Sequence, residues 1–118
     1  MFSFQLSAEQ QEFRDTVRDF VTREVKPVAN HPDRLQAEDP HFVPAILEQA
    51  SQMGLRTIAL SEALGGAGAD TLTACAVAEE LAAGDIGFAA TLARTSELGH
   101  VLFDQAMNDA QRKQFLDK

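Results

Sequence analysis

The sequence predicts an all-α fold, an up-and-down-like bundle of about five to six helices with no significant sheet. Three observations lead to this prediction. Apolar residues recur at helical spacing over long stretches of the chain. Residues that cap helices stand directly before these stretches, at Ser7, Asp70 and Asp85. The one segment that suggests a strand, residues 56–60, has no second strand with which to pair.

The composition indicates one acidic, globular domain over residues 1–118. Hydrophobic residues make up 45% of the chain, enough for a single core. The net charge of −8 argues against non-specific binding to nucleic acid or to anionic membranes. The only cysteine, Cys75, excludes an internal disulfide, and its apolar neighbours predict a buried, unreactive thiol. We see no signal peptide and no apolar run near the ~20 residues of a membrane span, so we expect a cytoplasmic protein.

The first predicted helix begins at Ser7 and has the clearest amphipathic pattern in the chain. Ser7 and Gln10 form the capping-box pattern, in which each side chain bonds the backbone N–H of the other residue. Pro27 removes one helical hydrogen bond, so the helix should end there or continue as a bent final turn. The apolar positions lie on one stripe, at Phe13, Val17, Phe20, Val21, Val25 and Val28.

A polar connection over residues 30–40 leads to a second predicted helix over residues 43–53. Gly54 is its stop signal, and residues 56–60 are expected to form a short extended piece after it. The inward positions of this helix are predicted to be Ile46, Leu47, Ala50 and Met53.

Three glycines, Gly65, Gly66 and Gly68, predict a tight, irregular turn before the third helix. Asp70 is expected to cap that helix, and Gly84 is expected to end it in the left-handed conformation. A glycine-rich turn before a helix can bind phosphate, but neither the Walker nor the dinucleotide pattern is complete here. The Asp70 carboxylate would also repel an anion at this helix end. The turn is therefore predicted to be structural.

Asp85 is predicted to cap a fourth helix over residues 86–96. Residues 98–100 are expected to interrupt or bend it, and Asn108 is expected to cap a last segment from residue 109 onward. That segment ends without a stop signal, which predicts that the polypeptide once continued. The inner face of the fourth helix is predicted to carry Phe88, Leu92 and Thr95, and the last segment an apolar face with Phe115 and Leu116.

The sequence shows no metal site. The histidines are far apart, and none stands at metal-ligand spacing from another ligand. His31 and His41 are expected to lie in a solvated loop, and His100 is isolated from both.

Carboxylates and hydroxyls also give no visible catalytic centre. Glu79 and Glu80 are adjacent, so on a helix they point about 100° apart and cannot face a common substrate. We expect one of them to be exposed and the other to lie at an element boundary, where an arginine can pair with it. Neither Ser61 nor Ser96 has a recognisable His/Asp arrangement nearby.

An ordered set of segments covering essentially the whole chain resembles the N-terminal helical domain of the acyl-CoA dehydrogenases. The sequence departs from the family at Ser61-Glu62-Ala63-Leu64, which replaces a segment that usually begins with proline. It also departs at Arg94 and Glu97, which are unusually charged for a pocket wall. The acyl-chain preference therefore stays open. The matching segments are FQLS (4–7), EQQEFR (9–14), VRDFV (17–21), EVKP (24–27), MGL (53–55), GGAGAD (65–70), AEELA (78–82) and NDAQRKQFL (108–116).

The resemblance implies a longer FAD-dependent enzyme with a middle β domain and a C-terminal helical domain. Its reaction is the α,β-dehydrogenation of an acyl-CoA thioester, in which a glutamate takes the α-proton and FAD takes the β-hydrogen as hydride. The electrons then pass to an electron-transferring flavoprotein. Because the glutamate and most flavin contacts lie in the later domains, we expect this chain alone to be inactive and to bind no FAD.

By the same resemblance, Thr91, Arg94, Thr95 and Leu98 line or approach the acyl chain. No residue here is expected to be catalytic, to bind the cofactor or to hold a metal. The alternative is that Leu98 belongs to the core and that Arg94 is solvated. The resemblance also implies a homo-oligomer for the full-length enzyme.

Two other functions remain open at this point. The chain could be a stand-alone helical interaction module that docks onto a separate chain carrying the other domains. It could also be a carrier of small apolar ligands, with a pocket between the third and fourth helices. For the carrier, we expect titration with a fluorescent fatty acid to show no saturable binding.

Overall fold

The computed structural model describes residues 3–32 and 44–116, and these residues contain helices and connections but no strand. This confirms the all-α prediction. The helical elements are α1 (Ala8–Phe20), η1 (Val21–Val25), α2 (Lys26–Ala29), α3 (Pro44–Gln52), η3 (Leu55–Thr57), η4 (Glu62–Leu64), α4 (Thr71–Gly84), α5 (Ile86–Gly99), η5 (His100–Ala106) and α6 (Asp109–Leu116).

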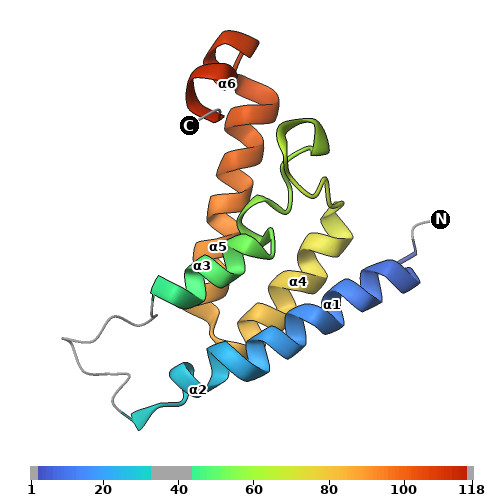
Figure 1. Cartoon of the computed structure of the whole chain (residues 1–118). Coiled ribbons are helices and arrows are strands. Elements are labelled where there is room, and N and C mark those ends of the chain that lie inside the picture. Colours follow the sequence, from blue (N-terminus) through green and yellow to red (C-terminus); the bar gives the residue numbers. More distant parts are fainter. Residues whose placement is uncertain (1–2, 33–43, 117–118) are drawn as a thin grey trace.

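Two long helical rods set the shape of the fold (Figure 1). The first consists of α1, η1 and α2, and α4 lies beside it. The second consists of α5 and η5 and ends at α6. α4 packs against both α1 and α5, while η3 brings the chain after α3 into contact with α5.

One hydrophobic core forms where these elements meet. Phe20 and Phe88 are at its centre, with their ring centroids 6.4 Å apart, and both are almost fully buried. The predicted stripe of the first helix is confirmed, because its central members are buried and Phe13 and Val28 pack against them. The buried members of the core are Val17, Phe20, Val21, Val25, Ile46, Ala50, Leu55, Ile58, Val77, Leu81, Phe88, Ala89 and Leu92.

Side-chain caps start the helices where the sequence predicts them. Ser7 and Gln10 form the reciprocal capping box, with the Gln10 side chain accepting from the Ser7 N–H at 2.8 Å. Each other cap accepts a hydrogen bond from an N–H three residues later. These bonds are Thr73 N–H to Asp70 (2.8 Å), Phe88 N–H to Asp85 (2.9 Å) and Gln111 N–H to Asn108 (3.0 Å).

The first helix continues past Pro27 rather than stopping there. Its turn over Val21–Val25 widens into a π-helix, and the Lys26 N–H donates to the Val21 carbonyl, five residues back. The helix then runs on to Ala29. Of the two predicted outcomes, the helix follows the second in that it continues past Pro27. Its final turn is nevertheless regular α-helix, and the irregular turn lies before Pro27.

The segment after Gly54 corrects the predicted extended piece over residues 56–60. Gly54 adopts the left-handed conformation (φ 78°) and stops α3 at Gln52, and Leu55–Thr57 then form a 3₁₀ turn. A helical turn places Leu55 and Ile58, three residues apart, on the same buried side. Residue 43, the predicted start of the second helix, lies outside the described residues.

The glycine turn folds back on the segment before it, as predicted for a structural turn. The Gly68 N–H donates to the Leu60 carbonyl at 2.8 Å. Gly66 lies so close to this carbonyl that a Cβ would overlap it, while Gly65 and Gly68 have positive φ angles of 87° and 59°. Gly66 is therefore needed for close backbone packing, and Gly65 and Gly68 are needed for their left-handed backbone conformation.

The prediction that Gly84 ends the third helix in the left-handed conformation is wrong. Gly84 is the last residue of α4, and it has no positive φ angle. A Cβ at this position would instead overlap the Val21 side chain and lie 3.1 Å from Val25 Cγ1. Gly84 is therefore needed because α4 approaches η1 closely.

The prediction of a buried Cys75 is also wrong, because Cys75 is exposed. Val77 and Leu81 are the buried residues of α4. Cys75 precedes Val77 by two residues, about 200° around the helix, so its side chain lies on the outer face. The alanine-rich sequence concealed this, since alanines give little indication of which face is inward.

The fourth helix is longer than predicted. α5 runs to Gly99 rather than to residue 96, and it continues without a break into the π-helical η5. The expected irregularity at residues 98–100 is thus a change of helix type. The predicted inner residues Phe88 and Leu92 are buried, and Thr95 is half-buried.

Candidate functional site

The four residues proposed to approach an acyl chain lie together on one face of α5. Thr91, Arg94, Thr95 and Leu98 follow the i, i+3, i+4, i+7 spacing of a helical stripe. Thr95 is half-buried and the other three are exposed, with Leu98 54% exposed. The alternative that Leu98 belongs to the core does not hold for this chain.

Most of the polar groups on this stripe are already used within the helix. The Thr91 hydroxyl donates to the Gly87 carbonyl at 2.9 Å, and the Thr95 hydroxyl donates to the Thr91 carbonyl at 2.8 Å. Both threonines thus present mainly methyl groups. Arg94 forms no hydrogen bond or ion pair with any described residue. The stripe is an apolar surface with one unpaired cation.

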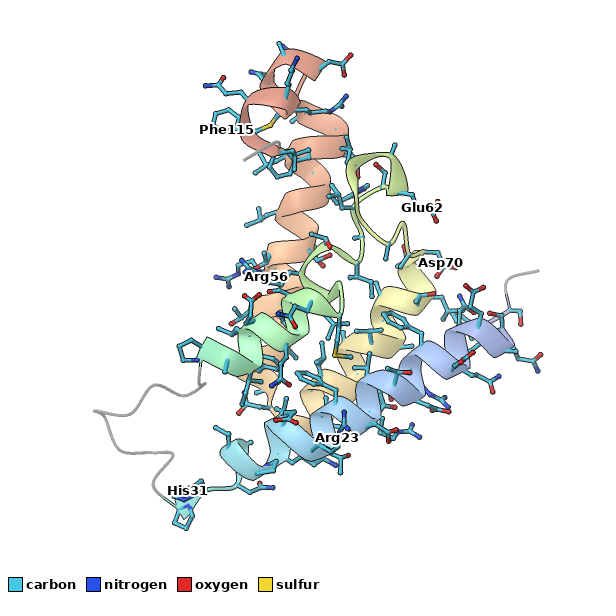
Figure 2. The ribbon with its side chains drawn as sticks, viewed as in Figure 1. Arg23, His31, Arg56, Glu62, Asp70 and Phe115 are labelled. Atoms are coloured by element: carbon cyan, nitrogen blue, oxygen red, sulfur yellow. The ribbon has the colours of Figure 1, made fainter. Side chains whose placement is uncertain are left out.

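The apolar surface continues from the stripe along η5 towards α6. Val101 and Leu102 are 48% and 43% exposed, and Phe115 on α6 is 55% exposed. Figure 2 shows Phe115 at the far end of this rod. Neighbouring exposed apolar side chains of this size are typical of a surface that binds a ligand or another domain.

Two polar side chains hold α5 and η5 against the segment before the glycine turn. The buried Ser96 hydroxyl accepts from the Ala59 N–H at 3.0 Å, and the Asp104 carboxylate accepts from the Ser61 N–H at 3.0 Å. Ser96 and Asp104 are eight residues apart, and in a regular α-helix such side chains would point in directions that differ by about 80°. The π-helical η5 changes this register, so that both side chains reach the same segment.

Asp104 also contacts His100, one helical turn earlier. His100 Nδ1 lies 2.8 Å from Asp104 Oδ2, and Gln105 Nε2 lies 3.0 Å from His100 Nε2. The hydrogen bonds from Ser61, with a further one from His100, lower the pKa of the Asp104 carboxyl against the opposing effect of desolvation. Sequence reasoning missed this cluster, although the four-residue spacing of His100 and Asp104 was a usable signal.

Glu79 and Glu80 do not form an acid/base pair. Glu79 is exposed, whereas Glu80 bonds Arg18 on α1 with an oxygen 2.6 Å from the guanidinium. The hydrogen bond from Arg18 lowers the pKa of Glu80, which stays an ionised partner in an ion pair. The expected pairing with an arginine is confirmed.

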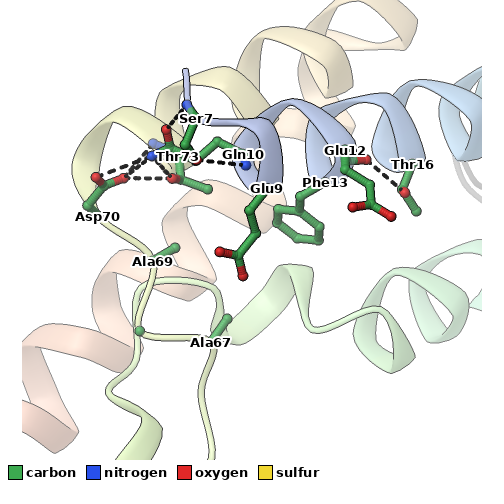
Figure 3. A pocket seen from close by; sticks show the side chains of 11 residues that line it. Ser7, Glu9, Gln10, Glu12, Phe13, Thr16, Ala67, Ala69, Asp70 and Thr73 are labelled. Carbon is green, nitrogen blue, oxygen red and sulfur yellow. Dashed lines mark hydrogen bonds between the residues drawn. The ribbon is translucent and has the colours of Figure 1, made fainter. Parts of the chain in front are cut away.

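The glycine turn borders an open cavity of 730 Å³ between α1 and the start of α4 (Figure 3). Its lining includes the carboxylates Glu9, Glu12 and Asp70. Hydrogen bonds from Thr73 lower the pKa of Asp70, which occupies the helix end where a phosphate would bind. Repulsion between like charges therefore makes this cavity unsuited to a phosphate group, in line with the sequence prediction.

Residues 3–32 and 44–116 were searched for groups of metal-ligating side chains and for membrane-spanning helices. No group of three or more metal-ligating side chains occurs there. None of the helices there is long and apolar enough to cross a bilayer. His31 is exposed, as expected, and His41 lies outside the described residues.

Comparison with known proteins identifies a family and several relatives. The model of the family "Acyl-CoA dehydrogenase, N-terminal domain" matches residues 7–118. The probable acyl-CoA dehydrogenase YngJ of Bacillus subtilis is 33% identical over 79 residues, 67% of this chain and 20% of that protein. The short-chain specific acyl-CoA dehydrogenase of Clostridium acetobutylicum is 37% identical over 78 residues, 66% of this chain and 20% of that protein.

A third relative matches over a longer part of the chain. The mitochondrial isobutyryl-CoA dehydrogenase of Dictyostelium discoideum is 28% identical over 111 residues, 94% of this chain and 26% of that protein. The chain thus spans between 20% and 26% of the length of these relatives. No solved structure gives a significant match. Because the family match extends over nearly the whole all-α chain, the chain belongs to the acyl-CoA dehydrogenase family and corresponds to its N-terminal domain.

Proposed function

We propose that this chain is the N-terminal domain of an FAD-dependent acyl-CoA dehydrogenase, which catalyses α,β-dehydrogenation of an acyl-CoA thioester. In this proposal, the stripe of Thr91, Arg94, Thr95 and Leu98 forms part of the wall of the acyl-chain pocket. The apolar surface that continues along η5 contacts the other domains of the enzyme.

The exposure of the stripe is the observation that supports this proposal. A helix of an isolated domain normally turns such residues inward, yet Leu98, Val101 and Leu102 all face outward. Threonine methyls beside leucine suit contact with a hydrocarbon chain. Arg94 is the exception, and it gives this wall a positive charge.

The glycine turn and the helix end at Asp70 do not suit the phosphates of the flavin. The glycine turn is closed against Leu60, and the carboxylate of Asp70 stands where a phosphate would have to bind. In this proposal the FAD, which accepts the hydride, is held by the middle and C-terminal domains, as is the glutamate that takes the α-proton. The chain described here then contributes packing and exclusion of water, and no proton transfer.

The proposal also includes the partners of the full-length enzyme. These are the acyl-CoA substrate, an electron-transferring flavoprotein that takes up the electrons, and further copies of the same subunit. The relatives support the first of these through their names, which include a short-chain specific and an isobutyryl-CoA dehydrogenase.

The test is to express the complete reading frame that encodes this chain, next to residues 1–118 alone. We expect the complete product to purify with flavin absorbance and to reduce an artificial electron acceptor when an acyl-CoA is supplied. Residues 1–118 alone should be colourless and inactive. A reading frame that stops after Lys118, or a complete product without flavin, would overturn the proposal and favour the stand-alone interaction module.

The role of the stripe is tested separately in the complete enzyme. Leu98→Ala should enlarge the pocket and shift the kcat/KM ratio for octanoyl-CoA over butyryl-CoA by about tenfold. Ile86→Ala is the matched control, because Ile86 is an exposed apolar residue of the same helix outside the stripe. Equal ratios for the Leu98 variant, the Ile86 variant and the unmodified enzyme would contradict a place for Leu98 in the pocket wall.

A further inference from the structure

A second cavity lies between α5 and the segment that connects α3 to α4. Its volume is 290 Å³. Figure 2 shows the Arg56 side chain beside α3 and α5 in this region. Residues from α3, η3, α5, η5 and α6 line it, namely Ser51, Arg56, Thr57, Leu60, Thr95, Ser96, Gly99, Phe103 and Leu116.

The inner wall of this cavity is apolar. Leu60, Phe103 and Leu116 supply large hydrocarbon surfaces. The Ser51 hydroxyl donates to the Leu47 carbonyl at 2.9 Å, and the Thr95 hydroxyl is likewise used within its own helix. These hydroxyls have no proton left for a ligand. A ligand would therefore meet mainly apolar atoms inside.

Among the described residues of the lining, Arg56 alone is charged. Its guanidinium has one long contact, 3.5 Å to the Ser51 hydroxyl, and no carboxylate among the described residues pairs with it. By contrast, Arg14, Arg18 and Arg112 each lie within 2.9 Å of a carboxylate oxygen. An arginine that is unpaired beside an apolar cavity is suited to bind a carboxylate in two-point fashion.

The size of the cavity limits the ligand to a short chain. An apolar cavity of about 150 Å³ in another protein binds benzene. Ligand pockets generally measure about 300–1,000 Å³, so a cavity of 290 Å³ lies at the lower end of this range. A short aliphatic chain fits these dimensions, whereas a whole CoA thioester does not.

We propose that this cavity binds a short aliphatic carboxylate. The chain lies among Leu60, Phe103 and Leu116, and the carboxylate bonds the guanidinium of Arg56. This site is distinct from the acyl-chain wall, because only Thr95 belongs to both, and it does not depend on the proposed function. A thioester lacks the anionic group that Arg56 would recognise.

The inference differs from the sequence-based expectation that a fatty acid does not bind. That expectation concerned a pocket between α4 and α5, which pack directly against each other. The cavity lies instead between α5 and the elements from α3 to η3. The sequence patterns do not indicate that Arg56 and Phe103 line the same cavity.

The test is isothermal titration of the 118-residue chain with hexanoate, and with hexanol as the uncharged analogue. Hexanoate should bind saturably, and hexanol should bind at least tenfold more weakly. Arg56→Gln should weaken hexanoate binding about tenfold or more, while Arg23→Gln, which removes an exposed arginine of η1 outside the cavity, should leave it unchanged. Absence of saturable hexanoate binding, or equal binding by the Arg56 variant, overturns the proposal.

A second variant tests the location without removing a charge. Gly99 lines the cavity, and a Cβ built on it meets no atom within 4 Å. Gly99→Leu should therefore fill the cavity while keeping the helix, with the circular dichroism spectrum as the check. We expect hexanoate binding to be lost in this variant. Full affinity for hexanoate in Gly99→Leu would show that the ligand binds elsewhere.

Discussion

Asp104 binds Ser61 across forty-three positions of sequence and thereby fixes the end of the long α5–η5 rod to the start of the glycine turn. The Asp104 carboxylate accepts the Ser61 N–H at 3.0 Å, and its side chain is only 15% exposed. Together with the Ser96 to Ala59 bond, this contact determines where the outer stripe of α5 lies relative to the rest of the domain.

Asp104→Asn should lower the midpoint of thermal unfolding by a few degrees at neutral pH. The amide keeps the shape of the side chain but loses the negative charge that strengthens the bonds from Ser61 and His100. Glu97→Gln is the matched control, because Glu97 is an exposed carboxylate on the same rod with no hydrogen-bond or ion-pair partner among the described residues. A midpoint shift as small as that of Glu97→Gln would contradict the proposed role of Asp104.

The contribution of Asp104 should disappear in acid. Hydrogen bonds hold the pKa of its carboxyl below the value of about 3.9 for an unfolded aspartate, so the folded state binds the proton less well. The stabilisation is then fully present above this pH and is lost as the pH falls through the folded pKa. The unmodified chain and Asp104→Asn should therefore differ in thermal midpoint at pH 7, and the difference should shrink as the pH falls below about 3.9, as differential scanning calorimetry can show. A difference that does not shrink in acid would point to a cause other than the charge.

Local patterns predicted the helix starts well, because a cap and its N–H lie three residues apart. Ser7, Asp70, Asp85 and Asn108 all act as predicted. Helix ends were harder to predict. Gly84 has a sequence context typical of a left-handed terminator, but its role depends on Val21, which lies on another helix. Such packing between distant segments leaves no local signal.

Ser96→Ala should destabilise the domain by about 1–2 kcal/mol, because it leaves the N–H of the half-buried Ala59 without its acceptor. Thr91→Ala provides the control. The Thr91 hydroxyl also makes a hydrogen bond, but it is exposed and bonds its own helix, so its loss should change stability by less than about 0.5 kcal/mol. Urea unfolding followed by circular dichroism measures both values. Equal stability of the two variants would mean that water replaces the Ser96 hydroxyl.

The stripe on α5 could be predicted only through resemblance, since threonine, arginine and leucine at helical spacing are also found on ordinary helices. The structure adds that Thr91, Arg94 and Leu98 are exposed, which no pattern on α5 itself reveals. The contacts that position the stripe depend on the π-helical register of η5, and the composition of residues 100–106 does not distinguish a π-helix from an α-helix.

Gly84→Ala should cost about 1–3 kcal/mol of unfolding free energy, because the added methyl overlaps Val21 and presses on Val25 in a close-packed region. Gly99→Ala is the matched control within a helix. Its Cβ meets open space, so it should be neutral or stabilising by about 0.5–1 kcal/mol. Chemical denaturation measures the unfolding free energy of both variants. A stable Gly84→Ala would show that α4 and η1 can move apart at little cost.

Cys75 should react with a thiol reagent such as Ellman's reagent in the native protein, at a rate close to that of the unfolded chain. Its side chain lies on the outer face of α4, and nothing covers it among the described residues. In a Cys75→Ser background, Val77→Cys provides the contrast, because Val77 is only 3% exposed and a thiol there should react only on unfolding. Cys75→Ser alone should change stability by less than about 0.5 kcal/mol. A native Cys75 that reacts as slowly as a cysteine at position 77 would mean that another surface covers the outer face of α4 in solution.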